Sequence, residues 1–143
     1  MKNEVIPVFL TIDDGFAKYT SVMIRSIIKN AAPQDHYKIW IIHRGLSDAN
    51  RQKLEGMATA NVEVETHFLK ADLSRIANRE ENYLRLDFFT LSSFYLLILA
   101  DEFTEYYKAI CLDCDADVPD NLADLYRFHL RNNLIEAAPD HSI

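Results

Sequence analysis

Glycine is scarce in this chain: Gly15, Gly45 and Gly56 are the only three among 143 residues. Three glycines so far apart cannot form the G-x-G-x-x-G fingerprint of dinucleotide-binding folds or the phosphate-binding P-loop, because both motifs need glycines within a few residues of each other. If the protein binds a phosphorylated ligand, something other than a glycine-rich loop must neutralise the ligand's charge.

Positive charge and long apolar runs are also lacking. The formal net charge is −7, and Arg79 and Arg85 form the only hint of a basic group, which argues against binding to nucleic acid or to anionic membranes. The longest apolar run, 94–100, is far too short to cross a bilayer. The apolar stretch 5–10 is short and no small-residue cleavage site follows it, so we expect no signal peptide and a cytoplasmic location.

Cysteine occurs only twice, as Cys111 and Cys114. Their C-x-x-C spacing would suit a redox pair or half of a zinc site, but there is no second pair, and His129 and His141 do not have zinc-finger spacing. Residues three apart on a strand face opposite sides of the sheet. We therefore expect two buried, unreactive thiols.

The remaining composition is that of one globular domain over residues 1–143, with 49% hydrophobic and 26% charged residues. Strand and helix patterns alternate, which predicts an α/β fold with a largely parallel, Rossmann-like sheet flanked by helices. The predicted strands are 7–12, 37–43, 61–68 and 107–112, with 134–138 as a fifth. The predicted helices are one ending at residue 30 with Val22, Met23, Ile27 and Ile28 on one side, one from a Ser47 or Asp48 cap to about residue 57, and one over 91–101.

Acidic residues follow two of these strands directly. Asp13 and Asp14 come after the first, and Asp113-Cys114-Asp115 comes after the fourth. In a parallel α/β sheet, ligands bind beyond the carboxyl ends of the strands. In an extended segment, residues two apart point the same way with Cα atoms about 6.5 Å apart, so Asp113 and Asp115 can jointly bind one hard divalent cation.

Other chemistries share this D-x-D segment, and a solvated turn is the commonest use of such a short motif. An EF-hand needs Gly and Glu at its sixth and twelfth positions, where this chain has Val118 and Asp124, so that interpretation fails. A haloacid-dehalogenase-type phosphatase would use Asp113 as its nucleophile, but the fifth motif position is Asp117 rather than Thr or Val. The phosphatase stays a weaker alternative.

Taken together, the chain resembles the first part of family 8 glycosyltransferases, the group that contains bacterial lipopolysaccharide galactosyl- and glucosyltransferases and glycogenin. A strand that ends in Leu-Asp-x-Asp is its most specific element. Four stretches in order carry the resemblance: Pro7–Tyr19, Ile39–Asp48, Phe94–Ile98, and Ala109–Val118 continued by Asn121–Tyr126.

This resemblance implies a GT-A type fold and transfer of a hexose, with retention at the anomeric carbon, from UDP-glucose or UDP-galactose to a glycan, lipopolysaccharide or other lipid-linked saccharide. Asp113 and Asp115 would hold Mn²⁺ or Mg²⁺ against the diphosphate, and Phe16 would stack on the base. Asp140 matches an acidic family residue that contacts the sugar and is the implied catalytic residue. The implied nucleotide contacts are Thr11, Asp13, Gly15, Phe16 and Cys114.

Three departures from the family pattern matter. Gly15 stands where the family commonly has Asn, and Tyr95 stands where it has a nucleotide-binding Arg. The family's later strands and a C-terminal His that completes the metal shell lie beyond Ile143. We therefore expect a domain incomplete at its C-terminus, which does not transfer sugar alone and self-associates through uncovered apolar surface. The alternative function is an inactive nucleotide- or metal-binding module with a regulatory or docking role.

Overall fold

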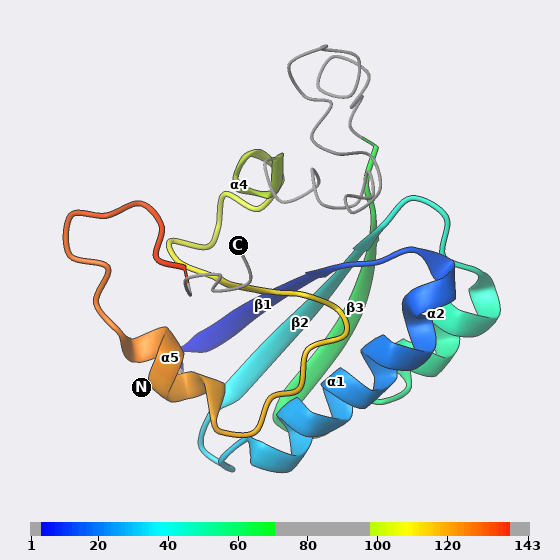
Figure 1. Ribbon diagram of the computed structural model, residues 1–143, viewed down its shortest axis with the longest axis horizontal. Coiled ribbons are helices and arrows are strands. Elements are labelled where there is room, and N and C mark those ends of the chain that lie inside the picture. The colour runs from blue at the N-terminus through cyan, green and yellow to red at the C-terminus, as the bar shows by residue number, and fades with distance from the viewer. Residues whose placement is uncertain (1–3, 71–97, 138–143) are drawn as a thin grey trace, which may run out of the picture.

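A four-stranded, wholly parallel sheet forms the centre of the computed structural model, which describes residues 4–70 and 98–137 (Figure 1). The strand order is β3-β2-β1-β4, with β1 at Val5–Thr11, β2 at His36–His43, β3 at Val62–Phe68 and β4 at Ile110–Leu112. The predicted α/β class and parallel sheet are confirmed. The helical elements are η1 (Asp14–Phe16), α1 (Ala17–Asn30), α2 (Asp48–Glu55), α4 (Leu99–Glu102) and α5 (Leu122–Arg127).

Side chains of the central strands alternate between two apolar layers, because successive residues of a strand face opposite sides of the sheet. Val8 and Leu10 of β1 pack into the larger layer with the buried residues of α1, α2 and α5. Phe9, between them, packs into a smaller layer with Leu99 of α4 and Phe103. The sheet is thus covered by α1 and α2 on one side and by α4 on the other (Figure 1).

The first two helices follow their sequence signals, with one correction. In α1, Met23, Ile24 and Ile27 are buried, but Val22 is 66% exposed, so its predicted place on the inner side is wrong. Consecutive helical residues differ by about 100°, and the buried stripe is centred on 23, 24 and 27. Helix α2 begins as predicted, with the Ser47 side chain accepting a hydrogen bond from the Asn50 backbone N–H.

The C-terminal third departs further from the predictions. Strand β4 has three residues instead of the predicted 107–112, since Tyr107 is fully exposed and only Ile110–Leu112 pair with β1. The predicted fifth strand is absent over 134–137, where every residue is exposed and offers no buried face to a sheet. The predicted helix 91–101 falls outside the described residues up to position 97.

The segment between β4 and α5 runs beside α1 and is tied to it by side-chain bonds (Figure 1). The Val118 N–H donates to Ser26 Oγ at 3.0 Å, and Asn30 Nδ2 donates to the Val118 carbonyl at 2.7 Å. These bonds join residues about ninety positions apart. They fix the path of the chain directly after the Asp113-Cys114-Asp115 motif.

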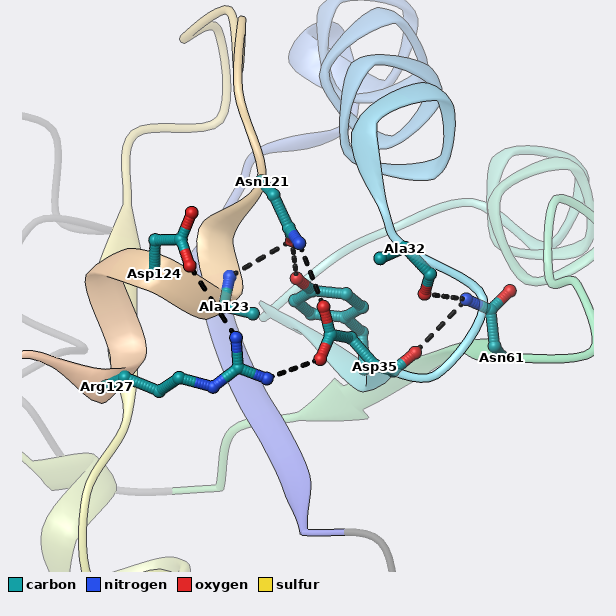
Figure 2. Close-up of polar contacts among 8 residues, drawn as sticks. Ala32, Asp35, Asn61, Asn121, Ala123, Asp124 and Arg127 are labelled. Carbon is teal, nitrogen blue, oxygen red and sulfur yellow. Dashed lines mark hydrogen bonds and ion pairs between the residues drawn. The ribbon is translucent and has the colours of Figure 1, made fainter.

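At the opposite end of this segment, a polar cluster around Asp35 holds α5 against the sheet (Figure 2). The Asp35 carboxylate accepts from Asn121 Nδ2 at 2.8 Å and from Arg127 at 2.6 Å, although its side chain is only 3% exposed. Asn121 caps α5, since its Oδ1 accepts from the Ala123 N–H, and it also accepts from the Tyr37 hydroxyl. Burial is the main cause that raises the pKa of Tyr37 to about 12.

Candidate functional site

The two acidic strand ends lie at neighbouring positions of the sheet. β1 and β4 pair in parallel with Leu10 opposite Leu112, so the residues that follow both strands leave the sheet at the same edge. The strand order also reverses between β1 and β4, because the sequence numbers fall from β3 to β1 and then jump to β4. Such a switch point is where open α/β sheets bind their ligands.

The carboxylates of the D-x-D segment are open to solvent. Asp113, Asp115 and Asp117 are exposed, whereas Leu112, Cys114 and Ala116, each directly before one of them, are half-buried against the larger apolar layer. The extended geometry predicted for this segment is wrong, because the Ala116 N–H donates to the Asp113 carbonyl at 3.2 Å and residues 113–116 form a turn. Exposed carboxylate oxygens are donors that suit Mn²⁺ or Mg²⁺.

Asp113 and Asp115 are a pair rather than a complete shell. Over residues 4–70 and 98–137, no three His, Cys, Asp or Glu side chains are arranged to hold a metal ion. Two carboxylates leave most positions around a hard cation to water or to the oxygens of a bound ligand. The described part of the site therefore suits a cation that arrives with, and is shared by, an anionic ligand.

The turn after β1 treats its two aspartates differently. Asp13 is exposed, and its carbonyl accepts from the Phe16 N–H at 2.9 Å to close the η1 turn. The Asp14 carboxylate instead accepts from the Ser47 N–H at 2.7 Å and from Asn50 Nδ2 at 2.9 Å. The hydrogen bond from the Ser47 backbone is the main cause that lowers the pKa of Asp14. Asp13 is thus the acid left open to a ligand.

An aromatic pair flanks this turn. Phe16 is 39% exposed, and its ring lies 5.9 Å from that of Tyr19, centroid to centroid. Lys18 places its ammonium 4.8 Å from the Tyr19 ring.

Thr11 is the half-buried last residue of β1. At Gly15, a Cβ atom would meet nothing within 4 Å, so the site has room for the larger residue that the family commonly carries there.

The prediction of two buried cysteines is half wrong. Cys111 is exposed, while Cys114 is half-buried beside the α1 side chains. Burial, followed by the neighbouring Asp115 charge, raises the pKa of the Cys114 thiol. A raised thiol pKa disfavours the thiolate, and no disulfide joins the two residues.

A buried histidine at this edge was missed by the sequence reasoning, which assigned no role to any histidine. His43 ends β2 and is 7% exposed, and its Nδ1 accepts from the Leu46 N–H at 3.1 Å. Burial, followed by the Arg51 charge, lowers its pKa. His43 therefore orders the loop that leads to Ser47 as a neutral ring with its proton on Nε2.

His43 should make the folded chain less stable as the pH falls. Because the folded-state pKa of His43 lies below its unfolded value near 6.5, the unfolded chain binds the proton first as pH drops. The His43 contribution is thus complete above about pH 6.5 and is lost as pH falls towards the folded pKa. In His43→Asn, which keeps an acceptor for Leu46, we expect urea-unfolding free energies to decline less than in wild type between pH 8 and pH 5.5.

His36→Asn, at the other end of β2, is the matched control, and it should retain the part of the pH-dependent loss that His43 causes. Identical pH slopes for wild type and His43→Asn would contradict the assignment of a neutral His43.

Asp140, the implied sugar contact, and Tyr95, at the position of the family's Arg, both lie outside the described residues.

The parallel sheet with helices on both sides has the GT-A type architecture. The structure is similar to the bifunctional glycosyltransferase WbbM in its apo form (TM-score 0.74, 24% identity, 92% of this chain and 22% of that one). It is also similar to an active-site variant of LgtC (TM-score 0.67, 23% identity, 87% of this chain and 43% of that one). These likenesses define the fold.

The chain belongs to glycosyl transferase family 8, whose model matches residues 7–143. General stress protein A of Bacillus subtilis (strain 168) is a relative with 23% identity over 141 residues, which are 97% of this chain and 48% of that protein. The chain thus spans about half the length of this curated relative. The resemblance drawn from the sequence is confirmed.

Among the residues that the structure describes, no helix combines the length and the apolar character that a membrane crossing needs.

Proposed function

We propose that this chain is the donor-binding part of a retaining, metal-dependent hexosyltransferase that uses UDP-glucose or UDP-galactose. The observation that carries the proposal is the parallel pairing of β1, which leads into Asp13, with β4, which leads into Asp113 and Asp115, at the switch point of the sheet. Membership of family 8 supports it. The acceptor we propose is a glycan or a lipid-linked saccharide of the lipopolysaccharide type.

Different residues of the proposed site would contact different parts of the donor. Asp113 and Asp115 would bind Mn²⁺ or Mg²⁺ against the diphosphate, and the cation would supply Lewis-acid stabilisation of the leaving diphosphate. Asp13 accepts hydrogen bonds from the nucleoside, and the exposed ring of Phe16 stacks on the base. Thr11, Gly15 and Cys114 line the same edge, and Asp140 is proposed to contact the transferred sugar.

UDP titration by calorimetry tests this proposal. We expect binding to the 143-residue chain in Mn²⁺ and little or none in chelator. The reason is that the diphosphate meets Asp13, Asp113, Asp115 and Asp117 in a protein of net charge −7, so only a cation can turn this repulsion into attraction. Equal affinity in Mn²⁺ and chelator would contradict the metal-bridge proposal.

Phe16→Ala should weaken UDP binding in a different way. Loss of stacking on one base costs on the order of 1–3 kcal/mol, and the change leaves both metal carboxylates untouched. We expect lower affinity in Mn²⁺ with the dependence on the cation preserved, measured by the same titrations. Tyr19→Ala, which removes the neighbouring ring, is the matched control and should lose less, and an unchanged affinity in Phe16→Ala would rule out stacking on this ring.

An inactive nucleotide- or metal-binding module is the second candidate, and the Gly15 observation favours it. The open space around this residue leaves the turn without the polar side chain that the family commonly places there. UDP binding is common to both candidates. Hydrolysis of a UDP-hexose or sugar transfer, measured with the chain, separates them.

A further inference from the structure

The turn that carries Asp13 and Phe16 is held from outside by the first turn of α2. Asp14 Oδ1 accepts from both the Ser47 N–H and Asn50 Nδ2, and the same Asn50 amide reaches the Asp14 carbonyl at 3.3 Å. Three hydrogen bonds thus join residues more than thirty positions apart. One side chain, that of Asn50, makes two of them.

Helix α2 is a firm support for this contact. Leu54 is buried in the larger apolar layer, and Glu55 accepts from both the backbone N–H and the hydroxyl of Thr66 on β3. Ser47 caps the helix and its carbonyl accepts from the Arg51 N–H at 2.8 Å. The position of Asn50 is therefore set by the sheet rather than by the turn it binds.

The turn has little else to fix it. Gly15 offers no side chain to pack, and glycine loses more conformational freedom on ordering than any other residue. The remaining constraints are the backbone bonds from the Phe16 N–H to the Asp13 carbonyl and from the Ala17 N–H to the Asp14 carbonyl, and the bond from the Thr20 hydroxyl to the Phe16 carbonyl at 3.0 Å. Removing the Asn50 contacts therefore leaves the Asp14 carboxylate with the single bond from the Ser47 N–H to hold segment 13–15 against α2.

We infer that Asn50 is a positioning residue that acts through Asp14 to fix the turn that carries Asp13 and Phe16. It thereby tunes nucleotide affinity without touching the ligand. This inference rests on the proposed function for its ligand and on the contacts above for its mechanism. It assigns different tasks to the two adjacent acids, with Asp13 facing the nucleotide and Asp14 facing α2.

The sharpest variant is Asn50→Asp, which keeps the shape and places a second carboxylate against Asp14. We expect UDP affinity in Mn²⁺ to fall about three- to tenfold, the size of one or two lost hydrogen bonds. An acid in the first turn of a helix is favourable, so the thermal midpoint should change little. Gln52→Glu adds the same charge to an exposed position of α2 and should stay within about twofold of wild type, by screening of an exposed charge.

A second substitution at position 14 separates positioning from general damage. In wild type, Asp14→Asn should lower the affinity because it weakens the acceptor for Ser47 and Asn50. In the Asn50→Asp background it should raise the affinity, because it removes the like-charge contact and lets the new amide donate to the new carboxylate. This reversal of sign is a coupling that independent structural losses do not produce.

Amide hydrogen exchange without nucleotide gives a reading that needs no ligand. Faster exchange at Ser47 and Phe16 in Asn50→Asp, but not in Gln52→Glu, is the expected result. Wild-type exchange at both amides, or additive effects of the two substitutions on affinity, would overturn the inference. Absence of UDP binding by the wild-type chain would instead contradict the proposed function, while the exchange data would still decide whether Asn50 anchors the turn.

Discussion

Asp115→Asn should lower UDP affinity in Mn²⁺ at least tenfold, which is about 1.4 kcal/mol or more, and the remaining binding should no longer respond to chelator. The carboxamide keeps the shape of the side chain but removes the charge that attracts a divalent cation. The family pattern offers no basic residue here to compensate the charge of the diphosphate, since Tyr95 stands where the family has Arg. The whole attraction for a diphosphate therefore depends on the cation and the carboxylates that hold it.

Asp117→Asn is the matched control for this experiment. Asp117 is exposed in the same segment, two residues further on, so its substitution makes the same change in net charge outside the proposed pair. We expect its UDP affinity and its Mn²⁺ dependence to stay close to those of wild type. A loss as large as that of Asp115→Asn would point to the overall negative field rather than to a metal held by Asp113 and Asp115.

Asp35→Ala should be strongly destabilising, with a loss of about 2–4 kcal/mol in the free energy of unfolding. The nearly buried carboxylate accepts from Asn121 and Arg127, and its removal leaves the part-buried Asn121 amide without that acceptor. The Arg127 side chain is 59% exposed and can return to water. Most of the cost should therefore come from the stranded Asn121 amide and the loosened cap of α5.

Asp124→Ala is the control, because Asp124 is the other acidic partner of Arg127, at 3.6 Å, with a side chain 81% exposed. Exposed ion pairs contribute about 0.2–1 kcal/mol, so urea unfolding should show a loss of no more than about 1 kcal/mol. Equal losses in the two variants would show that the Asp35 cluster is no more than a surface ion pair.

The Asp35 cluster should also affect the site, because the D-x-D segment connects β4 to α5 and the cluster holds α5 in place. Loss of the α5 cap should loosen residues 113–120 before the domain unfolds. In Asp35→Ala we therefore expect weaker UDP binding in Mn²⁺ at temperatures where circular dichroism still reports a folded chain.

The strands β1, β2 and β3 were predicted to within one or two residues because their patterns are local. The apolar run 6–10 is typical of a strand buried on both faces, and the alternation 62–65 is typical of a strand buried on one face. Both patterns can be recognised without knowing which strand pairs with which. The errors share one cause, which is dependence on partners far along the chain. β4 extends only as far as it pairs with β1, 134–137 has no face to bury, and the exposure of Val22 depends on where α1 touches the sheet.

The site divides in the same way. The acids Asp113 and Asp115 and the aromatic Phe16 were singled out from residue type and spacing alone. The arrangement of the two acids was not predicted, because residues 113–116 form a turn rather than an extended segment. Strand order is different, since it brings together residues about a hundred positions apart and puts the turn with Asp13 and the turn with Asp113 and Asp115 at the same edge of the sheet. Packing of α2 likewise assigns Asp14 to Ser47 and Asn50, and it buries His43 as a neutral ring. These roles depend on which hydrogen-bond donor lies nearby in space, and that is a property of the folded chain rather than of any local pattern.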